Sequence, residues 1–293
     1  MSDKFVMLAT DAKKCKRLEE IVKEGVLISP KLDGYRCLAI LDEGNCYLYS
    51  RNSHLFKNFP TIEVELSRCF PSDRYVFDGE IMGENGTFKE VQENAFAEKR
   101  LSNTCKLNYN IFDMIDFNEW NDKDFIEGAL DRYAKLSSVM SKIKSSIIKI
   151  VPHVTDNKLS NILAMEKTFV RQGYEGAIIC PVNEPYYQGR RSNKLMKLKT
   201  MISQDCVVTD FTEGMGKYKG ILGNIIVTQE NGMICEIGTG FTDDERKEIW
   251  NNKDNYKGRI VEIKYQELSG IGIMRFPVFV RWRDTKETKG LKI

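Results

Sequence analysis

The hydrophobic pattern of the first two-thirds of the chain alternates between two kinds of segment. Short runs rich in β-branched and aromatic residues are typical of strands, and they occupy residues 26–29, 35–41, 46–50, 75–81 and 109–115. Apolar residues three or four positions apart are typical of surface helices, and they occupy residues 59–69, 88–100, 129–143 and 159–172. This mixture of strands and helices predicts an α+β domain.

The pattern changes near residue 201. From there on, short β runs are separated by Gly-rich turns, and they read CVVTDF, NIIVTQ, CEIGTGF, RIVEIKY and FPVFVRW. One helix is expected between them, beginning at a capping box in which Thr242 and Glu245 each satisfy a free amide of the first turn. Five strands and one helix predict an OB-fold barrel. We therefore expect two domains, residues 1–201 and 202–293, joined by a short hinge.

Composition narrows the class of protein. Hydrophobic residues make up 42% of the chain, but no apolar run approaches the roughly 20 residues that span a bilayer. The first residues, MSDKFVMLAT, lack the features of a secretory signal, so we expect an intracellular protein. Eight scattered cysteines form no C-x-x-C pair, and there are only two histidines. Lysines and carboxylates must therefore supply most of the chemistry.

Positive charge is local. The formal net charge is only +2, yet residues 186–200 contain five basic residues and no acidic one: Arg190, Arg191, Lys194, Lys197 and Lys199. Such a tract suits a groove that binds phosphate groups.

The sequence K-L-D-G-Y-R at residues 31–36 lies between two predicted strands. A lysine is a poor nucleophile at its ordinary pKa of about 10.4. Neighbouring cations and a metal-bound nucleotide favour the neutral amine, which can attack phosphorus and form a phosphoramidate. Taken alone, the motif also fits a β-turn with Asp33-Gly34 at its tip. The choice therefore depends on the rest of the chain.

Five further blocks follow in order, and they read SRN at 50–52, FDGE at 77–80, YNIFD at 109–113, EGAI at 175–178 and KLK at 197–199. Each alone would fit a turn, a core ring or a solvated charge. Together with the lysine motif they resemble the covalent nucleotidyltransferase motifs of ATP-dependent DNA ligases of the minimal viral or phage type. The resemblance extends over nearly the whole chain.

The resemblance implies a set of site residues. Lys31 would carry AMP, with Asp33, Lys197 and Lys199 also catalytic. ATP would be held by Ser29, Lys31, Arg36, Glu80, Phe112, Glu175, Lys197, Lys199 and Arg283, with Phe112 stacking on the purine. Phosphates of nicked duplex DNA would be bound by Arg36, Arg51 and Arg190. Glu80 and Glu175 would hold Mg²⁺, with Mn²⁺ as the alternative metal.

Two further elements, one near the end of each expected domain, extend the resemblance. Residues 187–190 (YQGR) are similar to the Y-x-x-G-R element of minimal viral ligases, and residues 275–283 (RFPVFVRWR) to the motif R-x-P-x-F-x-x-x-R. The last motif implies that Arg283 orients pyrophosphate. Minimal viral ligases carry a long barrel insertion that forms a latch around DNA, but the corresponding segment is only TEGMGKYKGILGN. We expect a monomer that encircles DNA less completely.

Three alternatives remain open from the sequence. An mRNA-capping guanylyltransferase shares the lysine chemistry but would select GTP and needs no nick-binding arginine such as Arg51. An RNA ligase shares the core, although many lack an OB barrel. A non-catalytic OB-fold protein that binds nucleic acid has no need of four residues together: Lys31, Glu80, Glu175 and Lys199.

Overall fold

The computed structural model describes residues 6–83, 91, 107–120 and 127–283. The chain divides into two compact units, Met1–Lys199 and Thr200–Ile293. Helices and strands are mixed in the first unit and the predicted α+β class is confirmed. The helix expected at 88–100 lies outside the described residues, apart from residue 91.

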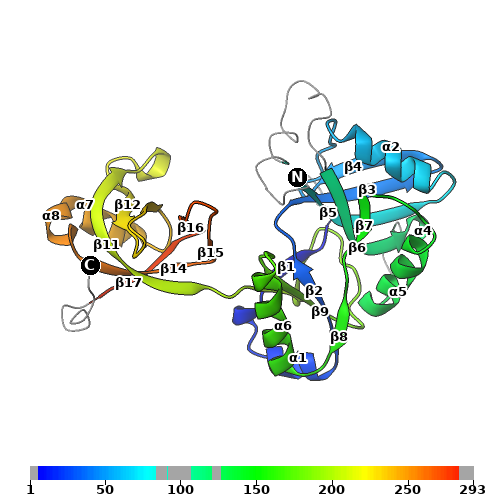
Figure 1. Ribbon diagram of the computed structural model, residues 1–293, viewed down its shortest axis with the longest axis horizontal. Helices are drawn as coiled ribbons and strands as arrows, with labels where there is room; N and C mark the ends of the chain where they lie inside the picture. The colour runs from blue at the N-terminus through cyan, green and yellow to red at the C-terminus, as the bar shows by residue number, and fades with distance from the viewer. Residues whose placement is uncertain (1–5, 84–90, 92–106, 121–126, 284–293) are drawn as a thin grey trace. The chain divides into compact units, whose positions relative to one another are not determined.

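One five-stranded sheet of the first unit has the strand order β4-β3-β5-β6-β7. Its strands are β3 (Tyr35–Asp42), β4 (Asn45–Ser50), β5 (Tyr75–Gly83), β6 (Leu107–Asp116) and β7 (Ile148–Ile150). Helix α2 (Pro60–Cys69) and helix α5 (Ala129–Met140) cover this sheet, and the short helix α4 (Phe117–Trp120) follows β6 (Figure 1). Buried residues such as Leu48, Leu66 and Phe77 form its core. The central strands β3 and β5 bury successive residues, so that Phe77 packs in this core whereas the neighbouring Val76 packs in a second cluster with Leu38. Because successive side chains of a strand point to opposite faces, both faces of these strands are covered.

The second sheet of this unit has the order β1-β10-β9-β2-β8. Its strands are β1 (Leu8–Asp11), β2 (Val26–Lys31), β8 (Val154–Asp156), β9 (Gly176–Pro181) and β10 (Arg191–Leu198). A short 3-10 turn η1 (Ala12–Lys14) and the helices α1 (Leu18–Lys23) and α6 (Leu159–Arg171) accompany it. Ile28, Ile162 and Ile179 pack in the core between β2, β9 and α6 (Figure 1). Strand β2 is therefore anchored on both edges and on one face.

The second unit contains a five-stranded sheet with the order β13-β12-β11-β14-β17. The strands are β11 (Ile202–Glu213), β12 (Leu222–Thr228), β13 (Ile234–Ile237), β14 (Ile260–Tyr265) and β17 (Val278–Trp282). Smaller elements are η2 (Gly216–Tyr218), α7 (Asp243–Asn251), α8 (Lys253–Tyr256), β15 (Glu267–Leu268) and β16 (Met274–Arg275). The Phe279 amide donates to the Thr239 carbonyl, 2.9 Å away, so the two edges of the sheet approach each other.

Two details of this second unit bear on the sequence predictions. The capping box is confirmed, because the Thr242 side chain accepts from the Glu245 amide and the Glu245 carboxylate accepts from the Thr242 amide. The connection between β11 and β12 is short and contains only η2.

Among the described residues, no helix is long and apolar enough to cross a membrane.

Candidate active site

The two sheets of the first unit line a pocket of about 350 Å³. Nine of the predicted site residues contribute to its wall, and they come from β2, β3, β4, β5, β6, β9, β10 and their ends: Ser29, Lys31, Arg36, Arg51, Glu80, Phe112, Glu175, Lys197 and Lys199. In the sequence these residues are spread from Ser29 to Lys199, which is most of the length of the first unit. The fold therefore gathers the motifs at one place.

Lys31 is the last residue of β2, whose first five residues are buried. The backbone carbonyl of Lys31 accepts from the Glu175 amide at 2.9 Å, and Lys31 is paired with Gly176 in the antiparallel ladder. The buried apolar run places β2 inside the sheet, and the strand runs along the pocket, since Leu27 and Ser29 line it as well as Lys31. Its position is thus fixed by backbone pairing rather than by side-chain contacts.

The Glu175 carboxylate binds two ammonium groups. Lys31 Nζ forms an ion pair with Glu175 Oε2, and Lys199 Nζ lies 2.8 Å from the same oxygen. Burial raises the pKa of Glu175, but the two ammonium groups outweigh burial and the pKa lies below its ordinary value. Burial and the charge of Lys31 lower the pKa of Lys199 although Glu175 opposes them. The three side chains form one partly buried charge cluster.

Glycines next to the charged residues allow this close approach. Gly176 has a φ of +144°, and a Cβ atom there would lie 2.2 Å from the Leu198 carbonyl oxygen. Glu175 and Lys199 flank these two residues, so the missing side chain lets β9 and β10 bring the ion pair together. A Cβ atom on Gly34 would likewise lie 2.4 Å from the Ile81 carbonyl oxygen. The D-G and E-G steps of the motifs therefore serve packing.

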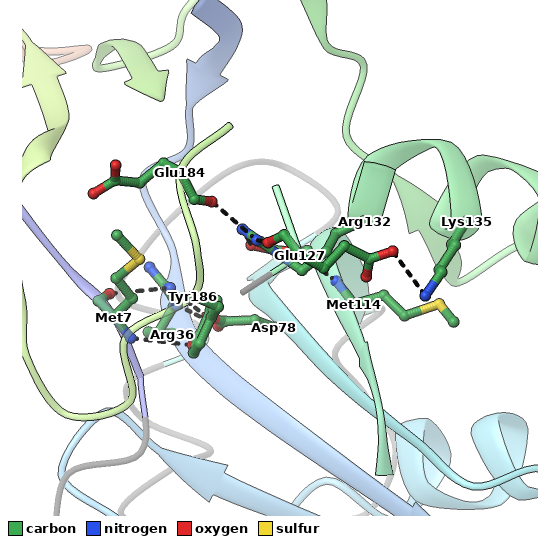
Figure 2. Close-up of polar contacts among 10 residues, drawn as sticks. Met7, Arg36, Asp78, Met114, Glu127, Arg132, Lys135, Glu184 and Tyr186 are labelled. Atoms are coloured by element: carbon green, nitrogen blue, oxygen red, sulfur yellow. Dashed lines mark hydrogen bonds and ion pairs between the residues drawn. The ribbon is translucent and has the colours of Figure 1, made fainter. Parts of the chain in front are cut away.

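A second charge cluster centres on Asp78, which is fully buried (Figure 2). Arg36 contacts it twice, with Nε 2.5 Å from Oδ1 and Nη2 2.6 Å from Oδ2. The Tyr186 hydroxyl donates to Asp78 Oδ2 and accepts from the Met7 amide at 3.1 Å. This network joins β3 and β5 to the segments that precede β1 and β10. It orients Arg36 at the pocket.

Arg132 forms a third charge cluster with Asp113 of β6, and both residues line the pocket. Its guanidinium binds Asp113 with Nε–Oδ1 and Nη2–Oδ2 distances of 2.8 and 2.9 Å. It also donates to the carbonyls of Glu127 and Glu184 (Figure 2). Because Arg132 is 1% exposed, these contacts tie α5 firmly to β6 and to the chain before β10. The wall that carries Phe112 is therefore rigid.

Glu80 and Phe112 face the pocket near Arg36. Burial raises the pKa of Glu80 to about 7, although Arg36 and Lys31 oppose the shift. The guanidinium carbon of Arg36 lies 4.4 Å from the centroid of the Phe112 ring. A cation over an aromatic face is an attractive arrangement. Arg36 therefore contacts both the Phe112 ring and the Asp78 carboxylate.

Three predicted residues lie elsewhere. Asp33 belongs to the connection between β2 and β3 and does not line the pocket. Arg190 is exposed in the turn before β10, whereas its neighbour Arg191 lines the pocket. Arg283 belongs to the second unit, where it forms ion pairs with Asp205 at 2.9 Å and Glu262 at 3.5 Å.

The donor set for a metal ion is small. Within residues 6–83, 107–120 and 127–283, His, Cys, Asp and Glu side chains form no group of three that could hold a metal ion. Glu80 and Glu175 nevertheless line the same pocket. Two carboxylates suit a hard divalent cation whose remaining ligands come from phosphate oxygens and water.

Sequence reasoning missed four residues that shape the pocket: Asp78, Asp113, Arg132 and Tyr186. The first two lie inside the motifs FDGE and YNIFD, so their proximity to Glu80 and Phe112 was an available signal. Arg132 sits on an amphipathic helix and Tyr186 beside a second tyrosine. No local pattern distinguishes either of them from a surface residue.

Models of known protein families match both units of the chain. The family model described as the ATP dependent DNA ligase domain matches residues 6–199. The chain belongs to the ATP-dependent DNA ligase family. A DNA ligase OB-like domain matches residues 213–283 and confirms the predicted OB-fold. Membership of the ligase family makes ATP the nucleotide and DNA the substrate.

Relatives of this ligase occur in bacteria, archaea and viruses. A DNA ligase of Haemophilus influenzae is 25% identical over 268 residues, which are 90% of this chain and 88% of that protein. A DNA ligase of Methanothermobacter thermautotrophicus is 26% identical over 77% of this chain but only 46% of its own length. For African swine fever virus DNA ligase the identity is 26% over 64% of this chain. The chain thus spans nearly all of the first relative and about half of the others.

Solved ligase structures share the fold. A Lig E DNA ligase superposes with a TM-score of 0.73 at 22% identity, covering 95% of this chain and 99% of the other. The Chlorella virus DNA ligase-adenylate gives a TM-score of 0.53 at 25% identity, covering 97% and 99%. Both similarities span the two units.

Proposed function

We propose that this ligase seals nicks between a 3′-hydroxyl and a 5′-phosphate in duplex DNA, through an AMP bound covalently to Lys31. The observation that carries the proposal is the cluster of Lys31, Glu175 and Lys199 at one end of the pocket. It contains an amine at the end of a rigid strand, a second cation and a carboxylate. These are the groups that nucleotidyl transfer to lysine requires.

The charge cluster suggests how Lys31 becomes a nucleophile. Without nucleotide, the Lys31 ammonium group is paired with the Glu175 carboxylate. A divalent cation held by Glu80 and Glu175 would compete with Lys31 for the Glu175 carboxylate, and the nearby charge of Lys199 would then oppose a second positive charge at Lys31. Lys31, whose side chain is partly exposed, passes a proton to solvent water; its neutral amine then attacks the α-phosphorus, the bond to the pyrophosphate breaks, and pyrophosphate leaves.

Lys197 and Lys199 lie beside the position expected for the α-phosphate. Both residues line the pocket, and negative charge accumulates on the non-bridging oxygens and on the leaving group during transfer. Positioned cations stabilise that charge in the transition state more than in the ground state. The two lysines are therefore assigned to charge stabilisation, and Asp33 to the turn that positions Lys31.

Mg²⁺ is the proposed metal, with Mn²⁺ as an alternative, and Glu80 and Glu175 are its proposed protein ligands. The ion supplies neutralisation of phosphate charge when it is bound. The raised pKa of Glu80 means that this carboxyl is partly protonated near pH 7 until a cation or cationic group draws its proton off. Ser29, Phe112 and Arg36 are assigned to the nucleoside and its phosphates.

The later steps use DNA. AMP moves from Lys31 to the 5′-phosphate, and the 3′-hydroxyl then displaces AMP and forms the phosphodiester bond. Arg51 and Arg190 are exposed arginines on the same unit, and with Arg36 they are assigned to nick phosphates. The short β11–β12 connection favours incomplete encirclement of DNA, so nick binding should weaken steeply with added salt.

The assignments for the second unit are also proposals. Arg283 would orient pyrophosphate during the first step, which requires the OB domain to approach the pocket and leave again through a hinge at residues 201–205. The predicted boundary after residue 201 lies close to the structural division after Lys199. A monomer in an intracellular compartment suits this mode of action.

One experiment tests the covalent step. The protein is incubated with α-labelled ATP or GTP and Mg²⁺, and the labelled adduct is then chased with nicked DNA or nicked RNA. We expect an acid-labile adduct with ATP that disappears on addition of nicked DNA. The variant Lys31→Ala should form no adduct, and Lys167→Ala on exposed α6 should behave as wild type. An adduct that survives in Lys31→Ala would overturn the proposal.

A further inference from the structure

His153 lies at the pocket although the proposed reaction leaves it unused. It precedes β8, which pairs with β2 through Val26–Asp156, Leu27–Thr155 and Ile28–Val154. Continuing this antiparallel register places His153 opposite Ser29. Residues directly opposite in an antiparallel pair project from the same face. The imidazole therefore belongs to the same wall of the pocket as Ser29.

The ring is held in one orientation. The His153 amide donates to the Tyr133 hydroxyl at 3.1 Å, and the two ring centroids lie 4.3 Å apart. His153 Nδ1 is 3.0 Å from the Val151 carbonyl oxygen. Because a carbonyl only accepts, Nδ1 must carry the proton. Burial lowers the pKa of His153 although Val151 and Asp113 oppose the shift, so the ring is neutral near pH 7 and Nε2 is an acceptor.

An acceptor at this wall distinguishes the two purines. Adenine carries an exocyclic amine at C6, which donates, whereas guanine carries a carbonyl oxygen there, which accepts. Stacking on Phe112 uses a π face that both bases share, and the apolar lining residues Leu27, Ala129 and Ile178 do not distinguish donors from acceptors. The base preference must come from a polar group beside the base.

We propose that Nε2 of His153 accepts a hydrogen bond from the exocyclic amine of ATP, and that this contact makes the pocket select ATP over GTP. The inference rests on the proposed function, since it names the base-reading residue of the same site. Tyr133 and Val151 act as positioning residues, because they fix the ring and its tautomer without touching the nucleotide.

The test measures kcat/KM for formation of the protein–nucleotide adduct with three triphosphates: ATP, GTP and purine riboside triphosphate, which has hydrogen at C6. In the wild type, ATP should exceed purine riboside triphosphate by about 10-fold, the order of one hydrogen bond. His153→Ala should lose that advantage while its rate with purine riboside triphosphate stays within about 2-fold of wild type. His153→Gln, which keeps an acceptor, should recover part of the preference for ATP.

Two controls separate base reading from structural damage. His54→Ala replaces the other histidine, which is exposed and outside the pocket lining, and should keep the wild-type preference. Tyr133→Phe removes the hydroxyl that holds His153 and should reduce the ratio of ATP to purine riboside triphosphate by a smaller factor. An equal fall with both nucleotides in His153→Ala, or an unchanged ratio, overturns the inference. If the wild type forms no adduct at all, the proposed function itself has failed.

Discussion

The pocket contains two carboxylate clusters that use similar groups in opposite ways. At one end, Glu175 is shared between Lys31 and Lys199, whose side chains are each 24% exposed. At the other end, Asp78 is fully buried and is bound by Arg36 through two nitrogens and by the Tyr186 hydroxyl. The first cluster is open to replacement of its contacts by a ligand. In the second cluster, loss of the Arg36 contact would leave the buried Asp78 carboxylate without its cation.

An ion pair alone does not show whether its residues serve catalysis or structure. A flexible lysine with one carboxylate contact can exchange its partner as a nucleotide arrives, whereas a planar guanidinium bound twice is locked in position. The Lys31 cluster is therefore suited to chemistry and the Asp78 cluster to architecture. Five substitutions test this distinction and the roles of the residues around it.

The largest expected effect is on catalysis at the exchangeable cluster. Glu175→Gln removes the carboxylate that both lysines contact and a proposed metal ligand, so formation of the ATP adduct should fall by about 1000-fold or more. The free energy of unfolding should change by less than about 2 kcal/mol, because the lysines keep access to water. Single-turnover labelling and urea denaturation give the two numbers. A large loss of stability with little loss of rate would reverse the assignment.

The next effect is on stability at the locked cluster. Asp78→Ala leaves Arg36 and Tyr186 without their buried partner and should lower the free energy of unfolding by about 3 kcal/mol. The matched control is Asp42→Ala, which removes the exposed pair with Arg74 and should cost less than about 1 kcal/mol. Urea titrations of both variants provide the comparison. Equal effects would show that Asp78 is not the architectural charge.

A pH-dependent effect is expected at Glu80, which lies between the two clusters. Its pKa is about 7 in the folded protein and near the ordinary value of about 4.3 in an unfolded chain. The folded state therefore binds more protons, and the stability from this group is complete below about pH 4 and lost as pH rises through about 7. Glu80→Gln should stabilise the nucleotide-free protein by about 2 kcal/mol at pH 8.5 and not at pH 4. Thermal unfolding across this range tests the sign, with exposed Glu19→Gln as control.

The smallest effects divide the steps of the reaction. Phe112→Ala should weaken ATP capture by about 10-fold, because stacking area is lost. Arg51→Ala should spare adduct formation and slow sealing by pre-adenylated protein by about 10-fold, since one charged contact to phosphate is lost. Rapid-quench assays of each step measure the rates separately. Equal losses in both steps for both variants would contradict the division.

Much of the fold could be predicted from the sequence where the pattern is long. The strands expected at 35–41 and 75–81 are long runs of β-forming residues and the helix expected at 159–172 has a helical apolar period, and they match β3, β5 and α6 closely. Strands β1, β7 and β8 were not predicted. They contain only three or four residues, too few for a period to emerge, and their pairing with distant strands stabilises them.

The site could be predicted only where chemistry and spacing coincide. Lys31, Glu175 and Lys199 sit in recognisable motifs, and the structure brings them together. The contact between Tyr186 and Asp78 spans 108 positions of sequence, and neither side chain has a local signal for it. The adjacent Tyr187, which begins the Y-x-x-G-R element, is 40% exposed, whereas Tyr186 is 7% exposed. Only tertiary packing distinguishes two neighbouring tyrosines.

Strand β2 has a further consequence for how an attached adenylate can travel. Its backbone is hydrogen-bonded to β8 on one edge and to β9 on the other, so the carrier amine moves only through the four methylenes of its own side chain. A side chain of that length spans only a few ångströms, so it cannot carry a bound adenylate to a separate site. On the proposed mechanism, the broken strand must therefore be brought to Lys31 before the adenylate can be transferred.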